Sequence, residues 1–495
     1  MIVVYFLTFV ATMTRLRSYT FAFILLSLTP IVGQSLNEVL TQYLDDSALS
    51  KAQNSILALD LTTGDTLMSF QSSLPLITAS TTKVFSTALA LEVLGREYRF
   101  STQLFYEGKL KDSILSGNIW IRGLGDVSFG SRFFHEEGQE MGALASLIDS
   151  LYAHGIKTVK GSIYIDGSAY GYAEIPQGWS AWDAGNYFGS FAAGINFYDN
   201  AANYYFSTGK AGRKAQFLGT YPNQAGLKLK NQLLSARIQG DHANLQGEPY
   251  SEVRIATGKL PAYQDSFRIR GSVADPERSF ADALTQVCFS RGFTVSKGVF
   301  GVRMKKVIIP DYDAIPELTR IPGRTVGELI HWTNGRSVNF FAEGLLNGVA
   351  YYLTGCGSNQ NALKVYGHYL ASRIDTANLR LYDGSGLSRK NRISASHLCG
   401  ILSYVFNSSI YQDFKNSLPV AGKSGTLKDL CKGQPGENKV FAKSGTMTGI
   451  KSYAGYVESI TGRKIVFTFI SSGYSCSQSY VKHHMELLIN ALASL

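Results

Sequence analysis

The sequence has few of the residues that build metal, redox or disulfide-rich sites. Its 495 residues include five cysteines and eight histidines. No two cysteines form a Cys-x-x-Cys pair and the histidines follow no ligand spacing, which disfavours zinc ribbons and thioredoxin-like sites. We therefore expect no metal site. Because five is odd, at least one thiol lacks an intramolecular disulfide partner.

Long apolar runs and long runs of one charge are also absent. No apolar run reaches the ~20 residues of a membrane span, and no internal repeat or low-complexity tract is evident. The 47 basic and 37 acidic residues give a net charge of +10 without any long basic run. Since nucleic-acid binders cluster their lysines and arginines, we expect no nucleic-acid partner. An anionic polymer and a peripheral contact with a membrane surface stay open as partners.

The composition is that of an ordinary globular protein, with 45% hydrophobic and 17% charged residues. At 495 residues the chain is long enough for two or three domains of ~150 residues. Helical periodicity surrounds short strands near both ends, and β-like runs rich in Gly, Asn and Tyr fill the middle, which predicts an interrupted α/β (α+β) fold. We divide the chain into a leader at 1–34, a first part of the α/β domain at 35–98, a mostly β insertion at 99–311 and a second part of the domain at 312–495.

The leader has the pattern of a secretory signal peptide. Arg15 and Arg17 precede an apolar stretch at 21–32, which small residues follow. We expect translation to start at Met13, and the mature protein to be exported across the inner membrane to the periplasm or cell envelope. The alternative is an uncleaved anchor made of this stretch and the apolar run at 2–11.

The first chemical motif is Ser80-Thr-Thr-Lys83, at the start of a predicted helix. At ~100° per residue, side chains three positions apart share a helix face, so the lysine can meet the serine. A neutral lysine amine can take the hydroxyl proton, and the helix N-terminus offers the Ser80 N–H to an oxyanion. A serine that merely caps the helix is the alternative, and this motif alone does not exclude it.

Two further motifs support the catalytic interpretation. Ser337-Val-Asn339 supplies a second hydroxyl and an amide at the head of another helix. Lys443-Ser444-Gly445 precedes Thr446 on a predicted edge strand, which directs Lys443 and Gly445 to one side and Ser444 to the other. The glycine lets a substrate lie close to the strand, and the Thr446 N–H can be a second oxyanion donor.

The order of these three motifs resembles that of the penicillin-recognising serine enzymes. More narrowly, the sequence resembles the D-alanyl-D-alanine carboxypeptidase/endopeptidase family of the penicillin-binding protein 4 type. The long insertion between the first two motifs, Tyr382-Asp-Gly-Ser-Gly-Leu-Ser-Arg389 and Leu418-Pro-Val-Ala-Gly422 carry this narrower resemblance. It implies an antiparallel sheet flanked by helices, a serine peptidase that acts on peptidoglycan stem peptides, and β-lactams as covalent inhibitors.

The motifs and the resemblance assign roles to individual residues. The catalytic residues are Ser80, Lys83, Ser337, Asn339 and Lys443, and the oxyanion donors are the N–H groups of Ser80 and Thr446. Acyl transfer by these residues needs neither a metal nor an organic cofactor. The substrate-binding residues are Ser444, Gly445, Thr446 and Met447, and the resemblance adds Asp183 and Arg389 as contacts for the charged ends of a diaminopimelate side chain. For Asp183 and Arg389 an ordinary surface charge is the alternative, and for Met447 a buried strand position.

Other interpretations have to be separated from this one. Lys423-Ser-Gly-Thr426 repeats the letters of the third motif, but a polar loop follows it, so we assign the motif to Lys443. Gly384-Ser385-Gly386 lacks the Gly-x-Ser-x-Gly spacing of a hydrolase elbow, so we expect a tight turn that lines the cleft. Two other functions stay open: a β-lactamase, whose acyl-enzyme hydrolyses faster, and a catalytically silent wall-binding protein.

Overall fold

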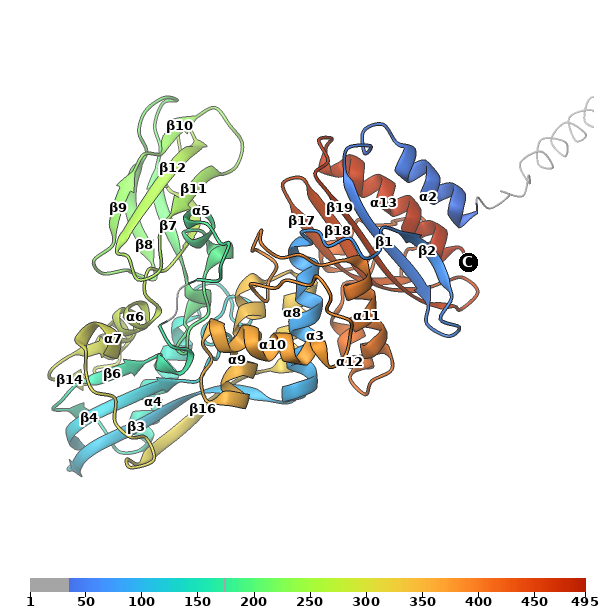
Figure 1. Ribbon diagram of the computed structural model, residues 1–495. Helices are drawn as coiled ribbons and strands as arrows, with labels where there is room; N and C mark the ends of the chain where they lie inside the picture. Colours follow the sequence, from blue (N-terminus) through green and yellow to red (C-terminus); the bar gives the residue numbers. More distant parts are fainter. Residues whose placement is uncertain (1–34, 173–174) are drawn as a thin grey trace, which may run out of the picture.

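The computed structural model describes residues 35–172 and 175–495. The predicted leader at 1–34, with Met13, lies outside these residues. Sheets at the two ends of an elongated molecule are joined by a layer of helices (Figure 1). None of the helices in the described ranges combines the length and the apolar character needed to cross a membrane. All five cysteines are free thiols.

The two ends of the chain together build one antiparallel sheet. Its strand order is β17-β18-β19-β1-β2, so β17 is an edge strand, as predicted for the strand that carries Lys443. The bounds are β1 Gln53–Asp60, β2 Thr66–Phe70, β17 Val440–Met447, β18 Ile450–Glu458 and β19 Lys464–Ser472. The chain ends with β18, β19 and a long helix, in keeping with the strands and helical periodicity expected near both ends.

Helices cover both faces of this sheet. On one face α2 and α13 pack over a core that includes Ile56, Phe467 and Leu488. On the other face α11 packs on β1 and β19, and α3, α8, α9, α10 and α12 extend this layer away from the sheet (Figure 1). The helix bounds are α2 Leu36–Asp45, α3 Lys83–Leu94, α8 Val326–Gly335, α9 Asn339–Thr354, α10 Asn359–Ala371, α11 Ala395–Phe406, α12 Tyr411–Ser417 and α13 Gln478–Ala493.

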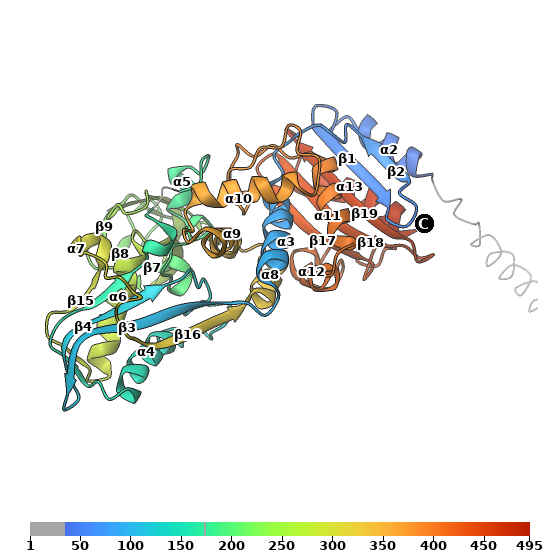
Figure 2. The same ribbon diagram turned by 60° about the horizontal axis from the view of Figure 1, so that its bottom comes forward.

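A second sheet lies beyond the helical layer. Its order is β14-β5-β4-β3-β16, with β6 beside β4 and β15 beside β6, and β16 leads directly into α8 (Figure 2). The strand bounds are β3 Arg99–Lys111, β4 Ile114–Gly123, β5 Thr158–Val159, β6 Ile163–Asp166, β14 Thr294–Val295, β15 Val299–Gly301 and β16 Glu317–Thr325. The prediction of a mostly β segment missed α4 (Met141–Ala153) and α6 (Pro276–Ser290), which pack together over this sheet. Leu144, Leu147 and Leu151 follow a helical spacing that carried the missing signal.

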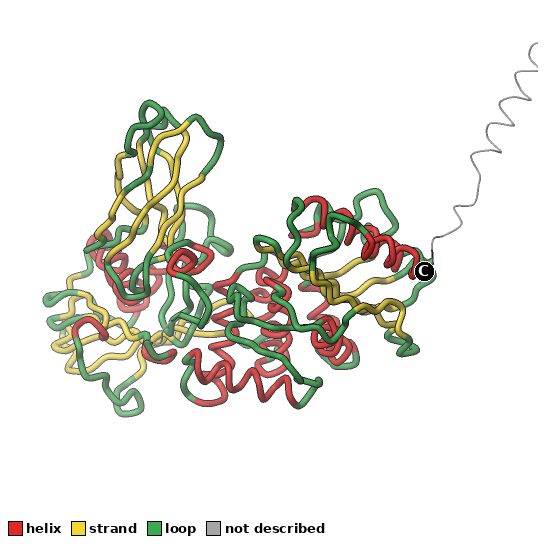
Figure 3. The backbone as a smooth tube through the Cα atoms, turned by 45° about the horizontal axis from the view of Figure 1, so that its top comes forward, coloured by secondary structure: helices red, strands yellow, loops and turns green. Residues whose placement is uncertain are grey.

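Residues 201–272 form what we call the tip unit, whose strands project from the rest of the molecule (Figure 3). A three-stranded sheet β13-β7-β8 and a four-stranded sheet, in which β10, β9 and β11 all pair with β12, share one apolar core. The bounds are β7 Ala201–Ser207, β8 Gln216–Tyr221, β9 Lys228–Asn231, β10 Leu234–Ala236, β11 His242–Gln246, β12 Val253–Pro261 and β13 Phe267–Ser272. Two four-residue helices, α5 Ala181–Ala184 and α7 Val302–Lys305, lie outside this unit.

Candidate active site

Ser80 lies in a 3-10 turn (Ala79–Thr82) that runs directly into α3. Ala79 enters the turn with a φ of +48°, and the turn tilts Ser80 into a partly exposed position while Lys83 is fully buried. The Lys83 Nζ lies 3.0 Å from the Ser80 Oγ. The predicted encounter of serine and lysine on one helix face is therefore present.

Lys83 has three oxygen partners. Besides Ser80, its Nζ contacts Asn339 Oδ1 at 2.6 Å and the Ser385 carbonyl oxygen at 2.6 Å. Burial lowers the pKa of Lys83 to about 7, although Asp383 and Glu343 act in the opposite direction. A neutral amine has two N–H donors and one lone pair. With its two N–H groups directed at Asn339 and Ser385, the lone pair is left for the Ser80 hydroxyl proton.

The second motif lies between α8 and α9. Ser337 has a φ of +60°, and its Oγ accepts a hydrogen bond from the Lys443 Nζ at 3.0 Å. Asn339 begins α9, as predicted, and its Nδ2 donates to the carbonyl oxygen of Phe188 at 2.8 Å. The three motifs thus meet through two lysines: Lys83 touches the first and second, and Lys443 touches the second and third.

The third motif occupies β17. Burial, and then the charge of Lys83, hold the pKa of Lys443 well below its usual value. Ser444 donates from its Oγ to Thr426 Oγ1 at 2.8 Å. Gly445 faces the Ser80 turn, because a Cβ there would lie 2.3 Å from the Thr78 carbonyl oxygen and 3.1 Å from the Ser80 nitrogen. The missing side chain therefore brings the strand against the nucleophile's turn; the expected contact with a substrate stays a prediction.

The arrangement of the three motifs agrees with the family and the relatives that the whole chain matches. A model of the D-Ala-D-Ala carboxypeptidase 3 (S13) family matches residues 36–494. The chain belongs to this family. A D-alanyl-D-alanine carboxypeptidase from an Actinomadura species is 27% identical over 463 residues, covering 89% of this chain and 81% of the relative. D-alanyl-D-alanine carboxypeptidase DacB of Haemophilus influenzae is 24% identical over 429 residues, covering 85% of each.

A solved structure shows the same fold. The crystal structure of penicillin-binding protein 4 from Haemophilus influenzae superposes with a TM-score of 0.77 at 21% sequence identity, covering 92% of this chain and 98% of that one. Family and fold together confirm three predictions: the penicillin-binding protein 4 type of family, the mixed helix-and-sheet fold class, and a serine-type D-Ala-D-Ala carboxypeptidase as the enzyme class.

Two buried carboxylates of this carboxypeptidase were missing from the predicted site. Glu343 accepts from the backbone N–H of Ser385 at 2.7 Å and of Gly384 at 3.1 Å. Asp383 accepts from the N–H of Gly386 at 3.0 Å and from Trp179 Nε1 at 2.9 Å. They hold the turn whose Ser385 carbonyl contacts Lys83, so Gly384-Ser385-Gly386 is the tight turn that the sequence predicts. Glu343 follows Asn339 by four residues on α9, a spacing that could have indicated it.

The repeated Lys-Ser-Gly-Thr sequence takes a different place in the carboxypeptidase fold. Lys423 is exposed, and Ser424 Oγ accepts from the Val420 N–H within its own loop. Only Thr426 reaches the site, through Ser444. This arrangement supports the assignment of the third motif to Lys443, and it adds Thr426 as a neighbour that sequence reasoning missed.

Within the described residues, none of the three outlying candidates forms a hydrogen bond with Lys83 or Lys443. Asp183 forms a capping box with Ser180 at the start of α5, with Ser180 Oγ 2.7 Å from Asp183 Oδ2. Arg389 is exposed and forms no ion pair with a described residue. Met447 is half-buried at the end of β17, where its carbonyl oxygen accepts from Gln478. Their contacts with a substrate stay predictions.

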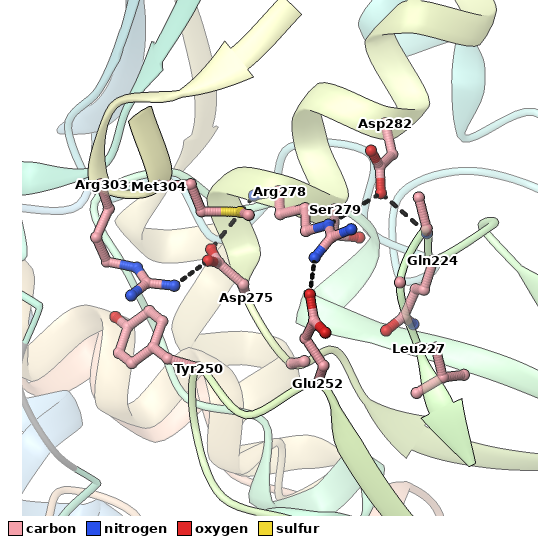
Figure 4. A pocket seen from close by; sticks show the side chains of 13 residues that line it. Gln224, Leu227, Tyr250, Glu252, Asp275, Arg278, Ser279, Asp282, Arg303 and Met304 are labelled. Carbon is pink, nitrogen blue, oxygen red and sulfur yellow. Dashed lines mark hydrogen bonds and ion pairs between the residues drawn. The ribbon is translucent and has the colours of Figure 1, made fainter. Parts of the chain in front are cut away.

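Two pockets differ in their relation to the site. One of about 510 Å³ borders Ser337, Val338 and Asn339 and is walled by Tyr187 and Phe188. A smaller pocket, of about 80 Å³, lies at the base of the tip unit and contains none of the predicted residues. There Arg278 lies between Glu252 and Asp282, and Arg303 pairs with Asp275 (Figure 4). In the described ranges no three His, Cys, Asp or Glu side chains gather as a metal site requires.

Proposed function

We propose that this protein cleaves peptidoglycan stem peptides between or after D-alanine residues, through an acyl-enzyme on Ser80. The observation that carries the proposal is the Lys83 amine, 3.0 Å from the Ser80 hydroxyl with two carbonyl-type oxygens at 2.6 Å. This arrangement supports a neutral amine whose lone pair points at the nucleophile. A lysine with a purely structural role would not require a serine hydroxyl beside its amine.

In the acylation step Lys83 accepts the Ser80 proton while Oγ attacks the carbonyl carbon of the substrate's D-alanine. The N–H groups of Ser80 and Thr446 stabilise the oxyanion. As the tetrahedral intermediate collapses and its C–N bond breaks, the leaving amine takes up the proton that Lys83 accepted, which restores the neutral Lys83 amine. Ser337, whose hydroxyl contacts Lys443, would relay this proton. The acyl group then stays on Ser80 until water attacks and releases it.

The terminal carboxylate of the substrate would bind to residues of β17. We infer that Lys443, Ser444 and Thr446 bind the terminal carboxylate, whose negative charge would raise the lowered pKa of Lys443 on binding. Asn339 would bind the substrate amide once the substrate replaces the Phe188 carbonyl. Asp183 and Arg389 would contact the charged ends of a diaminopimelate side chain, and Met447 would pack against the aliphatic part of the substrate.

Endopeptidase cleavage of cross-links uses the same nucleophile, so we include it in the proposal. A cross-linked peptide presents the same D-alanine carbonyl, joined to a larger leaving group. β-Lactams would imitate the D-Ala-D-Ala end and acylate Ser80. Action on the wall requires export, so we place the protein in the periplasm or cell envelope, with residues 1–34 as its signal peptide.

D-Alanine release from a soluble pentapeptide, measured beside cleavage of purified cross-linked muropeptide dimers, tests the proposal. The native protein should release D-alanine, and Ser80→Ala should release none while keeping the native fold by circular dichroism. Dimer cleavage that also depends on Ser80 supports the endopeptidase activity. Rapid turnover of penicillin without D-alanine release would instead support a β-lactamase.

A further inference from the structure

The tip unit carries most of the protein's excess positive charge. Residues 201–272 contain ten lysines and arginines and four acidic residues, a net charge of +6. Residues 35–495 as a whole contain 45 basic and 37 acidic residues, a net charge of +8. Less than a sixth of residues 35–495 therefore holds three quarters of the net charge of that range, and none of these residues belongs to the proposed active site.

Only part of this charge is neutralised within the molecule. Lys228, Arg268 and Arg270 pair with carboxylates, and Arg254 is buried against backbone carbonyls. Glu252, which pairs with Lys228, also pairs with Arg278 at the base of the unit (Figure 4). The other six basic side chains are exposed and form no ion pair with a described residue: Lys210, Arg213, Lys214, Lys230, Arg237 and Lys259.

Strand register aligns several of these residues on one face. Lys214 bridges to Leu234, Leu234 pairs with Lys259, and Lys259 pairs with His242. Directly paired residues point to the same side of a sheet, so these four side chains form a row across it. Lys230 joins this face through its pairing with Ile255, four residues before Lys259 on β12.

The remaining side chains of this face are mainly polar. Thr257 and Asn244 pair with each other beside the row, and Gln246 pairs with Ile255. At ~4.8 Å between strands, the row from Lys214 to His242 spans roughly 14 Å. We call the surface formed by Lys214, Lys230, Lys259 and these polar neighbours the basic face.

We propose that the basic face binds polymeric peptidoglycan and holds the enzyme on its insoluble substrate. This inference rests on the proposed function, because it takes its polymer from there. Stem peptides repeat carboxylates along the glycan, which complements a linear row of lysines, and hydroxyl and amide neighbours can hydrogen-bond sugars and peptides. The focused potential of such a face raises the local concentration of an oppositely charged polymer.

Co-sedimentation of the purified protein with isolated peptidoglycan sacculi tests the proposal. Lys214→Glu, Lys230→Glu and Lys259→Glu are combined in one variant. The matched control combines Lys51→Glu, Lys297→Glu and Lys432→Glu, which are also exposed, form no ion pair with a described residue and change the charge equally. The native protein and the control should sediment with the sacculi at low salt and dissociate as salt screens the charges. The affinity of the basic-face variant for the sacculi should be lower by about tenfold or more.

D-Alanine release from a soluble pentapeptide accompanies each binding assay. It should be the same in all three proteins, which also shows that the variants fold. Native-like sedimentation of the basic-face variant, or an equal loss in the control, would overturn the proposal. The proposal would also be overturned if phosphatidylglycerol vesicles bound the native protein but not the basic-face variant, while sacculi bound these two proteins equally. If the native protein releases no D-alanine, the proposed function fails, whereas the sedimentation difference still decides the role of the face.

Discussion

Lys83 has to be neutral to accept the Ser80 proton, so its protonation sets the pH dependence of acylation. Burial lowers its pKa to about 7. Protonation below that pH removes the lone pair, so the acylation rate should rise through pH 7 and fall about tenfold per pH unit well below it. Stopped-flow acylation with a fluorescent penicillin between pH 5 and 9 measures this, and a rate that is flat from pH 5 to 8 would contradict it.

Glu343 acts on Lys83 through the Ser385 turn. Its carboxyl group accepts two backbone N–H groups of the turn. Burial, and then the charge of Asp383, raise its pKa to about 8, so Glu343 is mostly neutral over the acidic limb of the pH profile. Glu343→Gln exchanges a neutral carboxyl for a neutral amide that keeps one of the two acceptor oxygens, so we expect a reduced maximal rate with the acidic limb still centred near pH 7. An acidic limb that moves to lower pH in the same stopped-flow assay would instead show that Glu343 is charged beside Lys83.

At the scale of elements, the site depends on how closely β17 approaches the turn before α3. Gly445→Ala would place a Cβ 2.3 Å from the Thr78 carbonyl oxygen, which is backbone and cannot rotate away. Displacing Ser80 by about 1 Å should slow acylation about 100-fold. The control is Gly367→Ala in α10, where a Cβ meets nothing within 4 Å.

The control should acylate like the native protein and gain up to ~1 kcal/mol of stability, because alanine favours a helix interior over glycine. Acylation kinetics and thermal unfolding of both variants test this pair. Native-like acylation by Gly445→Ala would show that β17 and the turn are not held at the distance described.

For the whole molecule, stability should not depend on disulfide bonds, although an exported protein meets oxidising conditions. All five cysteines are free, and Cys288, Cys399 and Cys431 are buried. A thiol reductant should therefore leave the unfolding temperature unchanged, since removing a native disulfide typically costs 2–5 kcal/mol. A drop of several degrees in a calorimetric scan with reductant would reveal a disulfide.

The parts of the molecule that sequence reasoning predicted are those carried by short, local patterns. Ser80-Thr-Thr-Lys83 contains its own geometry, because residues three apart on a helical turn share a face. For Ser337-Val-Asn339 the sequence predicts only the place at the head of a helix, which α9 confirms. Ser385 acts through its backbone carbonyl, which folding brings to Lys83 from 302 residues away. No spacing along the chain encodes such a contact.

The basic face could not be predicted from the sequence for a related reason. Lys214, Lys230 and Lys259 lie on different segments of the tip unit and are separated by many residues, so they form no basic run. Strand register alone brings them to one side of the sheet. The roles of Asp183, Arg389 and Met447 depend on a substrate, and they stay predictions.

The central claim is that Ser80 becomes acylated with Lys83 and Lys443 beside it. Intact-mass analysis after incubation with benzylpenicillin, followed by peptide mapping, tests it most directly. We predict one adduct per chain, located on Ser80, that persists in Lys423→Ala and is lost or formed far more slowly in Lys443→Ala. An adduct on any other residue, or none in the native protein, would contradict the account.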